Sequence, residues 1–517
     1  MDKNTFLAIF LSTAFLIVWF MFFQPKPAQV QSPKPGAVAA LANVQTELKG
    51  FPSAEPSQAQ ETSEREITVE TANYKAVFTT QGAAVKHWFL KDKSGTPIDL
   101  VHSGNISQLA TFPGSNFDVD QPEPLTLVFT HSSPLGWRVK KTFKLTDGFL
   151  HTLNIQLSKI KNSAQLPAFD VAWGPGLGTE LKEQKDNEAQ TRALALSASS
   201  PFSLEKMKPG DYPSKLYHWA AIDNRYFLAA FIPIKDTDFA NLAVARATKK
   251  LPPELSLRAS AADTAQSQDV SLLFYLGPKG HEHLKSFKLN LEETVDFGYF
   301  GFLGKLALGV LNYFYKMTGN YGWAIIILTV LLQIIVLPLT VKSFKASAAM
   351  KQLQPLVKEL QDKYKADPKR LNVEMLNLYK VHKVNPLGGC LPMLLQLPIF
   401  WALFTTLRNA IELRGAHWIL WVKDLSAPDT LLTIAGFPIN ILPLIMGVGM
   451  FFQQQMMSVS TDPAQQKLMY MMPVLFTFMF WNFPSGLVIY WLTNSILTMT
   501  EQYFIMKNQP VLGAVVK

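Results

Sequence analysis

Few residues of the chain have the type and spacing that catalysis or metal binding would require. His281-Glu282-His283 lacks the spacing of a helix-borne zinc site and predicts a solvated turn. The glycines between 174 and 178 predict a loop, because no strand-turn-helix pattern surrounds them. The sequence contains no Gly-x-Ser-x-Gly and no phosphate-binding loop, and its single cysteine, Cys390, excludes a Cys-based zinc site. We therefore expect a protein that is not an enzyme and uses no cofactor or metal.

The composition indicates that part of the chain lies outside water. Of 517 residues, 48% are hydrophobic and only 17% are charged, whereas soluble domains carry about 25% charged residues. Charges are normally frequent between Thr62 and His283, but long stretches beyond Lys383 carry none. This asymmetry predicts one water-soluble domain and one α-helical membrane bundle.

Six apolar stretches are candidates for transmembrane helices, each close to the roughly 20 residues that a bilayer requires. The first runs up to Gln24-Pro25 without a small-x-small site, which favours an uncleaved anchor over a cleaved signal peptide. Phe483-Pro484-Ser485-Gly486 divides the last apolar stretch into a short helix and a longer one. The predicted spans are 1–23, 321–341, 387–409, 433–457, 468–482 and 487–507.

The segment 342–386 fixes the expected orientation. It carries ten basic and four acidic residues, so the positive-inside rule places it in the cytoplasm. Six spans then put both termini inside, residues 24–320 and the loop 410–432 outside, and the loop 458–467 and the tail 508–517 inside. Much of the net charge of +9 is thus a topology signal, and no specific nucleic acid is needed to explain it.

The exported part is expected to be an all-β domain. Residues 24–60 read as a flexible linker, and 61–290 as a β-sandwich. Alternating runs flank Asp147-Gly148, which predicts a hairpin, and Ser271 to Leu276 predicts another strand. An amphipathic pattern in 291–320 predicts a helix at the outer membrane interface.

In the membrane half, several motifs occur in order at matching depths. They are Asn385-Pro386-Leu387-Gly388-Gly389-Cys390, Thr461-Asp462-Pro463 and Phe483-Pro484-Ser485-Gly486-Leu487. From about 320 to 507 the chain resembles the YidC/Oxa/Alb family of membrane-protein insertases. More weakly, Trp219 to Pro233 and Gly277-Pro278-Lys279 resemble the large periplasmic domain of its Gram-negative branch.

The resemblance implies a bacterial inner-membrane insertase with a five-helix core. Its groove would open to the cytoplasm and to lipid, and would shorten the dry path of a polar client segment without ATP. Nascent membrane proteins, the ribosome and membrane lipid would be its partners. Whether the chain acts alone or beside the Sec translocon (SecYEG, with SecDF) stays open.

The resemblance also implies the groove residues. The family carries an arginine in the second span, four residues after a threonine; here Thr329 is followed by Gln333. These two share a helix face, and Tyr490 and Trp491 lie at similar depth, so we expect all four to line the groove. An interhelical hydrogen bond is the alternative role for Gln333.

Methionines cluster around the fourth and fifth predicted spans. Flexible Met side chains repack against many apolar helices, so Met446, Met450 and Met471 are expected at the lipid-facing rim of the groove. Met is also ordinary filler of membrane helices, and both readings stand.

The turn of the cytoplasmic hairpin is the expected site of ribosome contact. Four basic residues, which we call the hairpin-turn cations, lie there: Lys363, Lys365, Lys369 and Arg370. The alternative to an insertase is a multi-spanning transporter or channel, which would predict charged residues along a pathway within the spans. Glu412 and Glu501 lie at predicted span ends and do not provide one.

Overall fold

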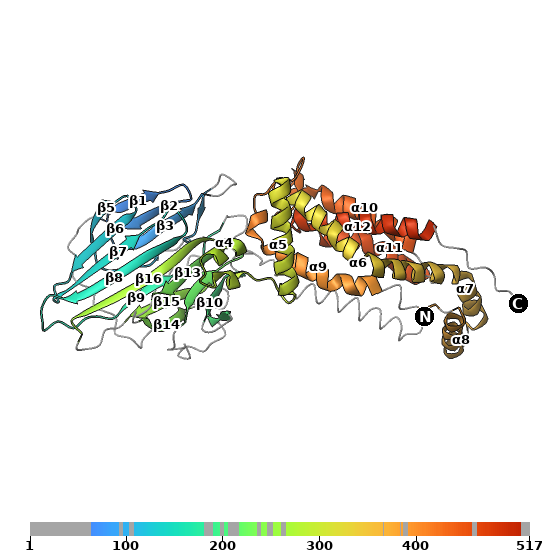
Figure 1. Cartoon of the computed structure of the whole chain (residues 1–517), viewed down its shortest axis with the longest axis horizontal. Coiled ribbons are helices and arrows are strands. Elements are labelled where there is room, and N and C mark those ends of the chain that lie inside the picture. The colour runs from blue at the N-terminus through green and yellow to red at the C-terminus, as the bar shows by residue number, and fades with distance from the viewer. Residues whose placement is uncertain are drawn as a thin grey trace. The chain divides into compact units, whose positions relative to one another are not determined.

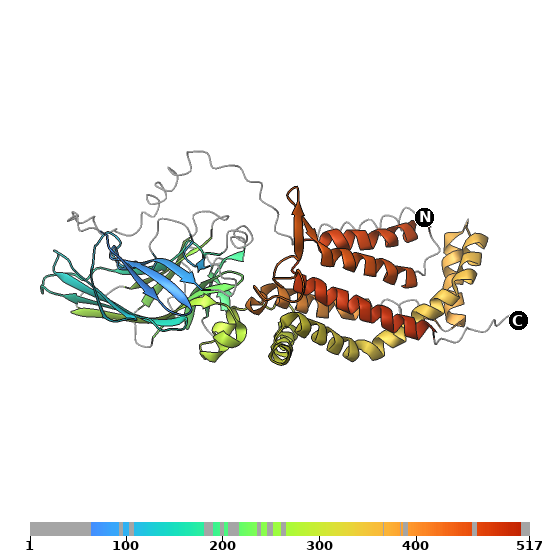
Figure 2. The same cartoon turned by 90° about the horizontal axis from the view of Figure 1, so that it is seen from above.

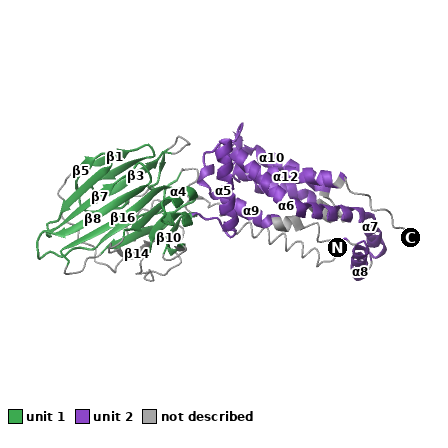
Figure 3. Ribbon diagram, viewed as in Figure 1, with its two compact units in different colours: residues 1–294 green, residues 295–517 purple. Residues whose placement is uncertain are grey.

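The computed structural model describes two compact units, residues 1–294 and 295–517, shown in Figure 3. The described residues are 64–91, 97–102, 108–179, 190–196, 201–204, 217–234, 239–245, 252–259, 265–365, 367–382, 384–385, 391–457 and 463–507. The predicted anchor 1–23, the linker 24–60 and the tail 508–517 lie outside them.

The first unit is built from antiparallel β-sheets (Figure 1). One sheet has four strands, β1 (Glu66–Glu70), β2 (Tyr74–Thr79), β3 (Ala84–Leu90) and β4 (Ile98–Asp99). A nine-stranded sheet has the order β11-β10-β12-β13-β16-β8-β7-β6-β5, and a three-stranded sheet has the order β14-β15-β9. Their bounds are β5 Asp118–Glu123, β6 Thr126–Ser132, β7 Trp137–Lys144, β8 Leu150–Lys159, β9 Phe169–Trp173, β10 Arg192–Leu196, β11 Pro201–Ser203, β12 Trp219–Asp223, β13 Phe227–Pro233, β14 Phe239–Ala245, β15 Glu254–Ala259 and β16 Ser267–Pro278.

Aromatic side chains join the four-stranded and nine-stranded sheets into a sandwich. Phe78 of β2 lies 5.0 Å from Phe143 of β7 between ring centroids, and Trp88 of β3 lies 6.3 Å from Phe274 of β16. All four side chains are fully buried, as alternation along half-buried strands requires. The predicted all-β domain is confirmed.

The local predictions for this unit hold with one exception. β7 and β8 pair across Asp147-Gly148, from Trp137 with Lys159 to Lys144 with Thr152. The stretch Ser271–Leu276 lies within β16, and the glycines after β9 form a loop. The turn predicted at His281 is wrong: residues His281–Ser286 form the short helix α4, because Leu284 buries its side chain and gives the segment an inner face.

The second unit is helical (Figure 2). Its elements are α5 (Gly301–Thr318), α6 (Tyr321–Gln352), α7 (Gln354–Lys363), α8 (Pro368–Val381), α9 (Leu391–Asn409), β17 (Thr430–Ile434), β18 (Phe437–Asn440), α10 (Ile441–Met457), α11 (Pro463–Met479) and α12 (Ser485–Lys507), with a short 3₁₀ turn at Ile411–Leu413. Another 3₁₀ turn, Leu291–Thr294, ends the first unit. By length and apolarity, α6 is the one described helix that could cross a bilayer; Ile441–Met456 and Met469–Met479 are apolar but shorter.

The helix boundaries follow local chemistry. Gly319 adopts a left-handed φ of 67° at the end of α5, and the Asn320 side chain caps α6 by accepting the Gly322 N–H at 2.9 Å. Asp367 likewise caps α8 after the break between α7 and α8. The predicted break at Phe483-Pro484 is confirmed, since α11 ends at Met479 and α12 begins at Ser485.

The expected start of the fourth span, residue 433, is wrong. Residues 430–440 form the hairpin β17–β18, and the helix begins only at Ile441. Ala435 and Gly436 have φ values of 50° and 82°, the two positive values that a tight hairpin turn needs. The absence of charge indicated an apolar segment, but it did not distinguish a strand from a helix.

Candidate functional site

The helix α12 lies at the centre of the helical unit. It packs against α6, α9 and α10, and α10 in turn packs against α11, while α5 packs against α6 and α9. Figure 2 shows α6, α10, α11 and α12 running side by side. Polar side chains of α6 and α12 therefore meet each other inside an apolar bundle.

Gln333 of α6 contacts two polar side chains of α12. Its Nε2 donates to Glu501 Oε2 at 3.0 Å and lies 3.5 Å from Thr498 Oγ1, and its side chain is buried. Thr329, one turn earlier and fully buried, donates to the Ile325 carbonyl of its own helix. The structure thus pairs one of the two predicted α6 residues with a carboxylate.

Sequence reasoning missed Thr498 and Glu501 as site residues. They are three apart on α12 and so share a face, which is the signal that could have drawn attention to them. Glu501 lies six residues before Lys507, so it is about 9 Å along the helix from its end. The sequence alone places it near the end of a predicted span, which does not indicate a contact within the bundle.

Tyr490 and Trp491 of α12 face different neighbours. The buried Tyr490 hydroxyl accepts a hydrogen bond from Gln396 Nε2 of α9 at 2.7 Å. The Trp491 ring lies 5.1 Å from Phe400 of α9 and 5.2 Å from Phe480 beyond the end of α11. These two residues join α12 to α9 and to the end of α11, and neither forms a hydrogen bond with Gln333.

The three predicted methionines have different environments. Met446 of α10 is fully buried, so it does not lie on an exposed rim; Met450 is half-buried, and Met471 of α11 is 58% exposed. Beside Met471 the exposed side of α11 is apolar, with Val474, Leu475 and Phe478. Helices α10 and α11 approach closely at Gly447, where an added Cβ would lie 2.0 Å from Thr477 Oγ1.

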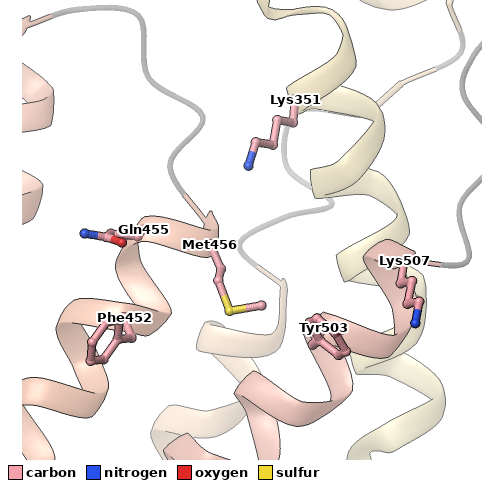
Figure 4. Close-up of a pocket in the computed structure, with 6 residues that line it drawn as sticks. All are labelled: Lys351, Phe452, Gln455, Met456, Tyr503 and Lys507. Atoms are coloured by element: carbon pink, nitrogen blue, oxygen red, sulfur yellow. The ribbon is translucent and has the colours of Figure 1, made fainter.

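A cavity of about 480 Å³ lies between the last turns of α6, α10 and α12 (Figure 4). It is lined by Lys351, Phe452, Gln455, Met456, Tyr503 and Lys507. None of the four predicted groove residues lines it.

The hairpin-turn cations are all exposed. The charged groups of Lys363 and Arg370 lie 5.4 and 5.3 Å from the centre of the Tyr364 ring, one from each side of the break between α7 and α8. No residue of α7 or α8 is fully buried, and the four cations lie on the exposed side of this hairpin.

Comparison with known proteins identifies the family. A family model described as 60Kd inner membrane protein matches residues 313–511, and one described as YidC periplasmic domain matches residues 66–308. The membrane protein insertase YidC of Endomicrobium trichonymphae is 49% identical over 515 residues, covering 99% of both chains. The chain belongs to the YidC family of membrane protein insertases.

Two further proteins are similar to this chain. The membrane protein insertase YidC of Pelobacter propionicus is 36% identical over 545 residues, covering 98% of this chain and 99% of its own. A solved structure described as an active YidC insertase with the first transmembrane domain resolved is 20% identical, with a TM-score of 0.41, covering 91% of this chain and 99% of that one.

Membership of the family settles the broad predictions. The chain is a membrane protein insertase with a periplasmic β-sandwich and a helical membrane region, and its substrates are nascent membrane proteins. The expectation of an insertase is confirmed over that of a transporter or channel.

Proposed function

We propose that the helical unit accepts client helices in a hydrophilic groove that opens toward the cytoplasm and is lined by Thr329, Gln333, Tyr490 and Trp491, with Glu501 added. The observation that carries the proposal is the contact between Gln333 and Glu501 within an apolar bundle. Each polar group buried in hydrocarbon without a partner costs several kcal/mol. A hydrated groove would lower this cost for the polar groups of both the protein and the client.

The exposed apolar side of α11 would receive the client's own apolar helix. Met471, Val474 and Phe478 are each more than half exposed there, and flexible or large apolar side chains adapt to varied partners. The drive would be burial of the client helix in lipid, so insertion would involve no covalent chemistry, and the chain would act without enzymatic activity or a cofactor.

The proposed setting is the bacterial inner membrane, with residues 24–320 in the periplasm and both termini in the cytoplasm. The basic hairpin α7–α8 would then face the cytoplasm, where the hairpin-turn cations would contact the ribosome. Cooperation with the Sec translocon is compatible with this arrangement, and cross-linking in native membranes would detect it.

Site-specific photo-crosslinking of a stalled client tests the groove. A photoreactive residue at Phe478, which is 66% exposed, should capture the client, and so should one at position 333. A probe at Phe302 of α5, which is 80% exposed, is the matched control and should not. Equal capture at positions 302 and 478 would mean that exposure alone explains cross-linking, and it would refute the groove.

Labelling with a membrane-impermeant thiol reagent tests the topology. The single native cysteine is first replaced (Cys390→Ser), and cysteines are then introduced at Ser286 and at Lys363. Only the first should react in intact cells stripped of their outer membrane, and the second should react after lysis. Labelling of both before lysis would refute the orientation.

A further inference from the structure

The cavity between the last turns of α6, α10 and α12 combines two cations with an apolar wall. Lys351 comes from the end of α6 and Lys507 is the last residue of α12. Phe452 and Met456 of α10 and Tyr503 of α12 supply the wall, and Gln455 adds an amide. Figure 4 shows Lys351 and Met456 extending from facing helices. The site is thus polar and apolar at once.

The two lysines have no acidic partner where the structure describes the chain. None of the six lining residues is acidic, and neither ammonium group forms an ion pair with a described residue. Lys507 lies 6.0 Å from the centre of the Tyr503 ring, a contact that leaves its positive charge uncompensated. Two lysines from separate helices line this one cavity, so their positive charges favour an anion there.

The apolar wall indicates what kind of anion. Phe452 is 55% and Tyr503 54% exposed, so large apolar surfaces adjoin the cations, and an inorganic ion would leave them uncovered. Basic pockets between membrane helices on the cytoplasmic side are suited to anionic lipid headgroups. We propose that this cavity binds an anionic phospholipid of the cytoplasmic leaflet, with the phosphate between Lys351 and Lys507 and an acyl chain along Phe452 and Tyr503.

This proposal rests on the orientation proposed above but is independent of the client groove. Thiol labelling tests the orientation, and client cross-linking tests the groove, so neither result is confused with lipid binding. The lipid would hold the ends of α6, α10 and α12 at one level in the membrane, because three helices contribute to one headgroup site.

Native mass spectrometry of the purified full-length protein measures the retained lipid. The protein is exchanged into detergent with added phosphatidylglycerol or phosphatidylcholine at equal concentration. Replacing one cavity lysine should weaken retention of phosphatidylglycerol about fivefold, and the pair Lys351→Gln/Lys507→Gln about 25-fold. Phosphatidylcholine should be retained far less by the unaltered protein.

Three further measurements decide the interpretation. The pair Lys342→Gln/Lys345→Gln removes the same charge from exposed positions of α6 and should change retention less than twofold. Phe452→Ser keeps both cations and should weaken the lipid but leave its headgroup preference. Inorganic phosphate at millimolar concentration should not displace the lipid.

If the two double variants lose phosphatidylglycerol retention equally, the lipid is attracted by general surface charge, and the proposal is overturned. Displacement by inorganic phosphate, which would make the anion alone the ligand, or equal retention of both lipids would also overturn it. Circular dichroism of each variant establishes that it is folded, and a single variant, Lys351→Gln or Lys507→Gln, replaces the pair if the pair is not.

Discussion

Replacing Gln333 with arginine tests whether the contact between α6 and α12 is hydrated. The Gln333 Nε2 lies 3.0 Å from Glu501 Oε2, so a guanidinium group in its place would lie beside a carboxylate. The expected result is that Gln333→Arg folds and that its free energy of unfolding falls by less than about 1 kcal/mol. The new ion pair replaces the hydrogen bond to Glu501, and such bonds between membrane helices contribute about 0.6 kcal/mol on average.

A double variant distinguishes solvation of the arginine by water from its stabilisation by the ion pair. In Gln333→Arg/Glu501→Gln the guanidinium has no carboxylate, and in a dry contact it would cost about 2.5–3.5 kcal/mol. In a hydrated groove water solvates the charge, and the double variant should lose no more than about 1 kcal/mol. Glu501→Gln alone should lose no more than about 1.7 kcal/mol, the upper value for one interhelical bond.

Denaturant unfolding of the full-length protein in lipid nanodiscs measures these differences. Leu331→Arg is the matched control, because Leu331 lies two residues earlier on a more exposed side of α6; facing lipid, it should lose about 2.5–3.5 kcal/mol. The hydrated groove is refuted if the double variant loses as much as this control, or if Gln333→Arg prevents folding.

Four other predictions follow from the structure. Burial lowers the pKa of His151 from 6.5 to about 3, so the unfolded chain binds an extra proton between these values. The free energy of unfolding of the β unit should therefore fall by about 2–3 kcal/mol as pH falls from 7.5 to 4.5. Urea unfolding of His151→Phe should show a free energy that depends less steeply on pH, and an unchanged dependence would contradict this. Gly447→Ala should lower the unfolding temperature by forcing α10 and α11 apart, whereas Gly449→Ala, which meets nothing within 4 Å, should not; equal shifts would exclude the close approach as the cause. Charge reversal of the hairpin-turn cations should weaken ribosome co-sedimentation and flatten its salt dependence. Unchanged binding would indicate that these charges only set the orientation of the chain in the membrane. Deleting residues 70–280 should leave insertion of a simple client measurable, and complete loss with a folded helical unit would move the active surface to the periplasmic domain.

Patterns within one segment allowed much of the fold to be predicted. Alternation around Asp147-Gly148 predicted β7 and β8 because strand periodicity and turn chemistry are both local. Phe483-Pro484 predicted the corner before α12 because proline cannot continue a helix with an intact hydrogen-bond ladder. Each of these signals requires only neighbours in sequence.

Contacts between distant segments could not be predicted in the same way. Periodicity placed Thr329 and Gln333 on one face, but nothing in α6 indicates which side chain 168 residues later will meet Gln333. The hairpin β17–β18 was missed because its stretch is as uncharged as the helix that follows. Tyr490 and Trp491 are adjacent, and adjacent helical residues point about 100° apart, so their common depth did not indicate which neighbours each side chain contacts.

The pairing of Gln333 with Glu501 also has a consequence for how this protein is made. A ribosome adds about 5–20 residues per second, so the 168 residues between the two side chains take about 8–34 s to synthesise. During that interval α6 has left the ribosome, and its amide lacks the carboxylate that it will finally contact. Since α12 is also the helix that packs on α6, α9 and α10, the bundle can close only when its last helix arrives. Until then a nascent copy has an unsatisfied polar group among apolar helices, which is the difficulty that the proposed groove would relieve for other nascent chains.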